Sequence, residues 1–301
     1  MPTTSVQPPG SKTLLPTSTL FAVGLVAFGL TQSTLEEIIR GMYTILTHED
    51  VLITDYIAIA GIGAAFVNAG LVTLISIAIL KLVNDPLNGA TLVTIGLMAG
   101  FSLFGKNILN IWPILTGTAI YAMLKKETFS HHVNLALRAT ALSPVVSFMA
   151  VRYSPWLGVL AGLLIGFVMP PVAEHAHRVQ NGMNLYSLGF SCGLVAMMLV
   201  PVFKAFGLNP ESALHWSTGN NLLLGTALAL LCLLALPAGC GEREEDPYFL
   251  YYREADLSFA AGGGVFQTET VYFTEAESAD PRALAEALLT ELLKGPFDET
   301  L

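Results

Sequence analysis

The chain has 301 residues, of which 53% are hydrophobic and only 12% are charged, whereas soluble domains carry about 25% charged residues. A soluble protein of this size could not cover so much apolar surface, so the composition predicts an integral membrane protein with the lipid bilayer as its partner. Residues 241–301 hold 14 of the 23 acidic residues and have a net charge of −10, while the first 240 have a net charge of +1. The membrane part therefore has no basic patch for nucleic acid.

The N-terminal region combines a polar leader with two different helical patterns. Residues 1–13 are polar and rich in Pro and Gly, which predicts a disordered N-terminus before an apolar segment at 14–32. In residues 33–50, apolar side chains such as Ile38 and Met42 recur at helical spacing among charged ones. This pattern predicts an amphipathic helix at the membrane surface.

Further apolar segments give about seven or eight in all and predict an all-α polytopic membrane protein. They lie at about 52–82, 91–124, 133–150, 155–170, 184–206 and 221–239. Residues such as Gly105, Asn107 and Pro113 interrupt 91–124, and helices broken in this way line the solute sites of many transporters. If basic residues mark the cytoplasmic side, this segment enters and leaves on one face, which predicts a re-entrant helix.

Two Asn-Gly segments predict an internal repeat. Residues 88–96 resemble residues 181–189 at an offset of 93, and each copy precedes a glycine-containing apolar run. One interpretation is a duplicated unit that binds a solute between two broken helices. The other is that glycine-rich membrane segments resemble one another by composition alone.

Polar and ionisable side chains inside apolar segments are costly, so each is a candidate for solute binding. Lys106 and Asn107 attract most interest because they lie at the break, where backbone groups are free to meet a ligand. Asp55, Arg138 and Lys204 could instead reach a nearby membrane surface. The full candidate set is Lys106, Asn107, Asn110, Asn68, Asp55, Asn181 and Asn184.

No pattern predicts an enzyme or a cofactor. The sequence contains no nucleophile elbow, no phosphate-binding glycine loop and no HExxH motif. Glu174, His175 and His177 are possible metal ligands by residue type, but they follow Pro170-Pro171 in an expected loop without a second cluster. We interpret them as a polar loop rather than a metal site.

Several motifs carry a resemblance to a known family. The sequence GFSLFGKNILNIWP at 100–113, with Asp55-Tyr56, Leu142-Ser143-Pro144, Pro170-Pro171 before His175, and Asn184-Leu185-Tyr186, resembles a bacterial family of multi-spanning membrane proteins. That family is known only as domain of unknown function 1576. The resemblance covers about residues 15–225 and implies a fold and a multi-pass protein of the bacterial inner membrane, but no activity.

The C-terminal part has a different character. Residues 222–240 resemble a bacterial lipoprotein signal in which Cys240 would be lipidated, and the acidic residues after it resemble the start of a GerM-type sporulation and germination domain. Lipidation would place Cys240 outside the cell, whereas the loop charges place the C-terminus inside. We expect a disordered segment at 1–13, a transmembrane domain at 14–239, and at 240–301 an acidic soluble tail that forms an incomplete, small α+β domain, joined to the membrane part near residues 220–225.

Two functional hypotheses follow. The first is a transporter-like protein that moves a small solute through a polar site at broken helices, motivated by Lys106, Asn107 and Asn110. The alternative is an envelope scaffold that does not transport and acts on sporulation or cell-wall machinery through its tail.

Overall fold

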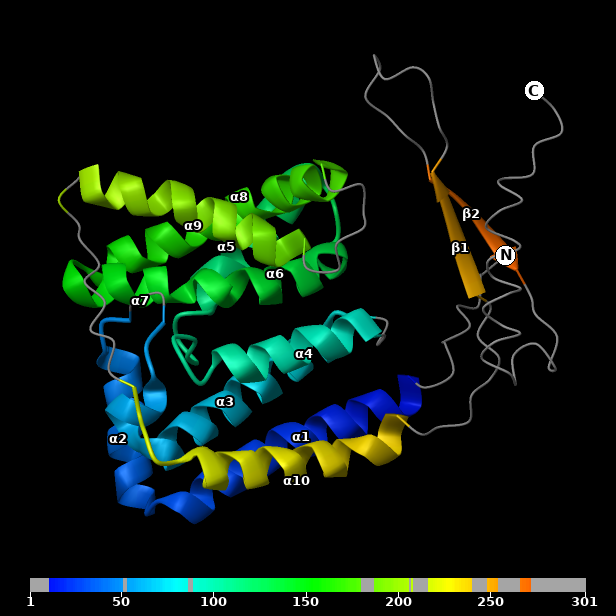
Figure 1. The fold of residues 1–301 in the computed structure, drawn as a ribbon. Coiled ribbons are helices and arrows are strands. Elements are labelled where there is room, and N and C mark those ends of the chain that lie inside the picture. The colour runs from blue at the N-terminus through cyan, green and yellow to red at the C-terminus, as the bar shows by residue number, and fades with distance from the viewer. Residues whose placement is uncertain are drawn as a thin grey trace, which may run out of the picture. The chain divides into compact units, whose positions relative to one another are not determined.

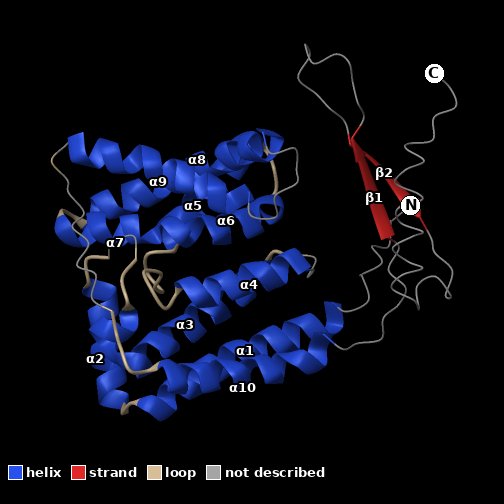
Figure 2. Ribbon diagram, in the orientation of Figure 1, coloured by secondary structure: helices blue, strands red, loops and turns tan. Residues whose placement is uncertain are grey.

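The computed structural model describes residues 11–50, 53–85, 89–179, 187–205, 207, 216–239, 248–253 and 266–271. The chain divides into two compact units, Met1–Gly241 and Glu242–Leu301. The described part of the first unit is helical (Figure 2). Its α-helices are α1 (Ser11–Gln32), α2 (Leu35–Thr47), α3 (Tyr56–Leu82), α4 (Gly89–Phe101), α5 (Trp112–Lys125), α6 (Val133–Ala139), α7 (Ser143–Arg152), α8 (Pro155–Val179), α9 (Ser187–Ala205) and α10 (Asn221–Gly239), and its short 3₁₀ helices are η1 (Phe129–His132) and η2 (Thr140–Leu142).

Five helical stretches are long and apolar enough to cross a bilayer. In the described residues they are Leu14–Gln32, Tyr56–Leu82, Phe129–Arg152, Pro155–Ala176 and Leu188–Ala205. A hydrocarbon core of about 30 Å needs roughly 20 residues of helix, and α3, with 27 residues, meets that length with some tilt. The chain is therefore a multi-pass membrane protein, as its composition predicts.

The helices of the first unit form two groups with α4 between them (Figure 1). One group contains α1, α3 and α10, with α1 packed on both of the others. The second contains α5 to α9, in which α8 packs on α5, α6, α7 and α9. Because α4 contacts α3 in one group and α6 in the other, the segment that follows α4 begins in the middle of the unit.

Glycine allows the closest crossings of these helices. A Cβ on Gly166 of α8 would collide with the Ile114 carbonyl of α5, and one on Gly117 of α5 would collide with the Leu163 carbonyl of α8. The Thr118 hydroxyl donates to the Gly166 carbonyl across the same crossing, at 2.9 Å. Small residues and hydroxyls of this kind stabilise helix pairs in membranes, because the hydrophobic effect does not drive helices together in lipid.

Helix α2 begins with a capping box. The Thr34 amide donates to the Glu37 carboxylate at 2.8 Å, and the Glu37 amide donates to the Thr34 hydroxyl. Its buried face, which includes Ile38 and Ile45, packs on α3. Apolar side chains also remain exposed on α2, including Tyr43, in keeping with the helical pattern read from residues 33–50.

Two boundaries differ from the sequence predictions. Helix α3 begins at Tyr56, so Asp55 lies at its N-terminus and not inside the span: its Oδ1 accepts from the Ile57 and Ala58 amides. Helix α8 continues through Pro170-Pro171 to Val179, so Glu174 and His175 lie on a helix and not in a loop. Helix α8 continues through the two prolines because its packing on α5, α6, α7 and α9 outweighs the local effect of proline.

The second unit contains two antiparallel strands in its described part. They are β1 (Tyr248–Arg253) and β2 (Phe266–Val271), and Tyr248 pairs with Val271 while Arg253 pairs with Phe266. Residues 272–301, which hold the rest of this predicted domain, lie outside the described residues. The predicted small α+β domain therefore stays a prediction.

Candidate functional site

The candidate site is built on the non-helical segment 102–111, which separates α4 from α5. Gly105 has φ +120°, a conformation that side chains other than glycine rarely adopt, and the Pro144 ring lies 2.8 Å from where its Cβ would be. The Lys106 amide donates to the Phe101 carbonyl at 3.2 Å, which closes the end of α4. The chain therefore turns sharply at Gly105 and presents the side chain of the next residue inward.

Asn107 and Asn110 hold this turn by bonding to each other's backbone. The Asn107 amide donates to the Asn110 side-chain oxygen at 2.9 Å, and the Asn110 amide donates to the Asn107 side-chain oxygen at 3.0 Å. Short side-chain amides favour turns because they offer the backbone such local partners. Both amide oxygens are therefore used within the segment.

Amide groups also satisfy the carbonyls that the break leaves without helical partners. The Asn110 side-chain nitrogen donates to the Gly105 carbonyl and to the Ser147 hydroxyl of α7, both at 2.9 Å. From α3, the buried Asn68 donates to the Ser102 carbonyl at 2.8 Å and to the Lys106 carbonyl at 2.9 Å. A buried carbonyl without a partner costs about 1–3 kcal/mol, so these bonds stabilise the break.

Lys106 carries a basic side chain at the break that forms no ion pair in the described residues. Its side chain is 1% exposed, and its Nζ lies 3.1 Å from the Met98 sulfur and 5.4 Å from the centre of the Phe101 ring. A thioether is a weak acceptor and an aromatic face is a weak partner, and neither replaces the hydration of an ammonium group.

A cavity of about 270 Å³ lies beside Lys106. It extends from the break to α9, and apolar side chains dominate its lining. The lining includes Phe101, Phe104, Leu142, Pro144 and Ala196, together with Cys192 of α9. Lys106 therefore places one buried amine at a small apolar cavity.

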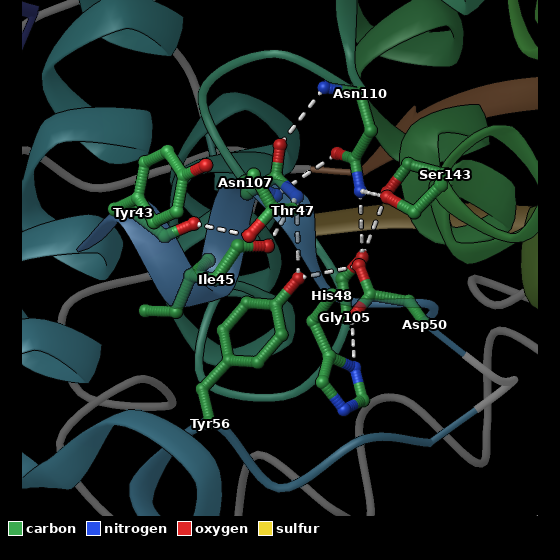
Figure 3. Close-up of polar contacts among 11 residues, drawn as sticks. Tyr43, Ile45, Thr47, His48, Asp50, Tyr56, Gly105, Asn107, Asn110 and Ser143 are labelled. Carbon is green, nitrogen blue, oxygen red and sulfur yellow. Dashed lines mark hydrogen bonds and ion pairs between the residues drawn. The ribbon is translucent and has the colours of Figure 1, made fainter. Parts of the chain in front are cut away.

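A second buried polar cluster lies beside Asn107 and Asn110 of the break (Figure 3). Asp50 is fully buried, and its Oδ2 accepts from the Tyr56 hydroxyl at 2.8 Å. Its Oδ1 has no hydrogen-bond partner and lies 3.7 Å from the His48 Nδ1, which also has none. The Tyr56 hydroxyl in turn lies 3.4 Å from the Asn107 side-chain nitrogen, so this cluster reaches the break.

His48 and Asp50, which lie between α2 and α3, both have raised pKa values. Burial raises the pKa of Asp50, although the hydrogen bond from Tyr56 and the nearby His48 and Ser147 side chains oppose the shift. The neighbouring Asp50 carboxylate raises the pKa of His48, against partial burial. Both groups therefore stay protonated to a higher pH than usual.

The structure places the remaining sequence candidates elsewhere. Asp55, besides capping α3, accepts from the Ser217 amide at 2.8 Å. Arg138 is partly buried and donates to the Thr94 hydroxyl at 2.8 Å, while Lys204 is exposed near the end of α9. Asn181, Asn184 and Cys240 lie outside the described residues, and so do Asn88 of the first Asn-Gly segment and residues 181–186 of the second. The repeat stays a prediction, and the helices after the two segments differ in length, because α4 ends at Phe101 and α9 runs for 19 residues.

Two of the three alternative metal ligands have described side chains. Glu174 and His175 are exposed on α8, and the side chain of His177 lies outside the described part. A search of that part found no group of three His, Cys, Asp or Glu side chains that could hold a metal.

Sequence reasoning missed His48, Asp50 and Ser147. Acidic residues in short loops are usually solvated, so nothing local marks Asp50 as buried. One clue in the sequence is that Asp50 directly precedes the long apolar segment at 52–82. Its burial, however, depends on contacts with Tyr56 and α7 that form only in the folded structure.

The chain was also compared with known proteins. No curated protein and no solved structure matches it. A family model described as "Protein of unknown function (DUF1576)" matches residues 34–205, which confirms the family predicted from residues 100–113 and the accompanying motifs. The C-terminal segment lies outside the match, so its GerM-type resemblance stays a prediction. Because the match covers more than half of the chain, the protein belongs to this family of unknown function.

Proposed function

We propose that the protein is a transporter of the bacterial inner membrane that moves a small solute through a site at the break between α4 and α5. The observation that carries the proposal is Lys106, a buried amine without a carboxylate partner in the described residues, at the edge of a cavity. An ionisable group inside a membrane protein is expensive and usually marks a solute or ion pathway.

The position of the cavity supports a transport role. It is bounded on one side by the break and on the other by α9, the helix that follows the second Asn-Gly segment. Transporters commonly bind solutes where a broken helix meets a helix of the other structural half. The hydrogen bonds made by the side-chain amides of Asn68, Asn107 and Asn110 would keep segment 102–111 in place while α9 moves.

Uptake into proteoliposomes tests the proposal with solutes of three charge types. We expect one of three radiolabelled probes, 4-methyl-2-oxopentanoate, choline or glucose, to enter vesicles that contain the full chain faster than protein-free vesicles. Lys106→Met should reduce that uptake at least about tenfold, because binding in the pathway depends on the buried amine. Lys125→Met, which changes an exposed lysine at the end of α5, is the matched control.

Two results would count against transport through this site. One is that none of the three probes enters faster than in protein-free vesicles, and the other is that uptake is unchanged by Lys106→Met. Removing residues 242–301 should leave uptake intact under this proposal, whereas the envelope-scaffold hypothesis assigns the function to that segment.

A further inference from the structure

We infer that the cavity beside Lys106 binds a small organic monocarboxylate, with its carboxylate at the Lys106 ammonium and its apolar body against the cavity wall. This inference rests on the proposed transport function and names its substrate class. It follows from the charge, the lining and the size of the cavity.

The charge of the site selects an anion. Lys106 is 1% exposed, and its amine is close to a thioether and an aromatic ring. Removing an ammonium group from water costs several kcal/mol unless a negative charge accompanies it. Asp50, the buried carboxylate near the break, accepts from Tyr56 and faces His48, so an anionic ligand supplies the negative charge at Lys106.

The lining selects one charge on an apolar body. Phe101, Phe104, Leu142, Pro144 and Ala196 offer no side-chain hydrogen bonds to hydroxyls or to a second anionic group. A sugar or an inorganic phosphate would leave polar atoms without partners there, at a cost of about 1–3 kcal/mol for each group. An aromatic or branched apolar body instead gains from contact with the two phenylalanine rings.

The volume selects a small molecule. Ligand pockets usually measure about 300–1,000 Å³, and this cavity, at about 270 Å³, is slightly smaller than that range. Benzoate combines one carboxylate with a compact apolar ring and is therefore a suitable probe.

Binding to the purified full chain in detergent tests the inference. We expect benzoate to raise the apparent unfolding temperature in a saturable manner, and benzamide, which has the same shape without the charge, to have no effect. Sodium chloride and sodium phosphate at equal concentration should not reproduce the benzoate effect. Lys106→Met should weaken benzoate binding at least tenfold, while Lys125→Met retains wild-type binding.

A second variant guards against misfolding of the first. Cys192→Asp places a carboxylate on α9 in the same cavity, where it can neutralise Lys106. This variant should fold at least as stably as the wild type and lose the benzoate effect. Equal effects of benzoate and benzamide, an equal effect of phosphate, or benzoate binding that survives both substitutions would overturn the inference.

The two proposals fail in different ways. Benzoate binding that depends on Lys106, without uptake of any probe, would refute transport and leave the binding site standing. Uptake of choline or glucose that depends on Lys106, without benzoate binding, would support transport and refute the carboxylate assignment.

Discussion

Replacing Asn68 by leucine is expected to lower the free energy of unfolding by about 2–5 kcal/mol, because two buried carbonyls at the break would lose their donor. These are the carbonyls of Ser102 and Lys106, at 2.8 and 2.9 Å from the Asn68 nitrogen. Leucine also removes the Asn68 side-chain oxygen, which is buried without a partner, and this offsets part of the cost. Chemical unfolding in detergent measures the change.

Thr73→Val is the matched control for this substitution. Thr73 is also buried on α3, but its hydroxyl donates to the Ala69 carbonyl of its own helix, at 2.6 Å. Its removal leaves no carbonyl outside α3 without a donor, so the effect should stay below about 1 kcal/mol. Similar losses for the two variants would show that Asn68 has no special role at the break.

The stability of the protein is expected to fall as the pH rises from 5.5 to 8, and Asp50→Asn should remove most of that fall. The pKa values of both Asp50 and His48 are raised above their ordinary values of 3.8 and 6.5. The folded state therefore binds protons more tightly than the unfolded state. The resulting stabilisation is complete below the ordinary pKa and is lost as the pH rises through the raised one.

The pH range in which the stabilisation is lost differs between Asp50 and His48. The contribution of Asp50 begins to fall above about pH 4 and that of His48 above about pH 6.5. Each unit by which the buried Asp50 pKa is raised corresponds to about 1.4 kcal/mol at alkaline pH. Apparent unfolding temperatures across this range, with the exposed Glu36→Gln variant as control, measure the effect. A wild-type curve that is flat, or that rises with pH, would contradict the raised pKa values of His48 and Asp50.

The membrane-spanning segments could be predicted because their signal is local. Apolar length alone identifies a span, and the predicted segments at 14–32 and 52–82 correspond closely to α1 and α3. Residues such as Gly105 and Pro113 also mark the break, since glycine and proline are unfavourable inside helices. The signal is not decisive, because packing carries α8 through Pro170-Pro171. The exact start of α3 could not be predicted from hydropathy, because it depends on Asp55 acting as a helix cap.

The roles of the polar residues could be predicted only in part. Composition marks Asn68, Asn107 and Asn110 as unusual, but it does not distinguish an amide that binds a solute from one that bonds a carbonyl of the break. The burial of Asp50 depends on Tyr56, the first residue of α3, and on α7, which is distant in the sequence. Side-chain partners of this kind arise from tertiary packing and leave no local pattern.

The most direct test of the account is the rate at which charged methanethiosulfonate reagents modify Cys192, which lines the cavity with Lys106. Cys232 and Cys240 are first replaced by serine, and an anionic and a cationic reagent are compared on the folded protein. If the cavity is a water-reachable site whose positive charge comes from Lys106, Lys106→Met should lower the ratio of anionic to cationic rates at least about fivefold, and benzoate should slow both reactions. An unchanged ratio, or a Cys192 that reacts only after unfolding, would contradict the account.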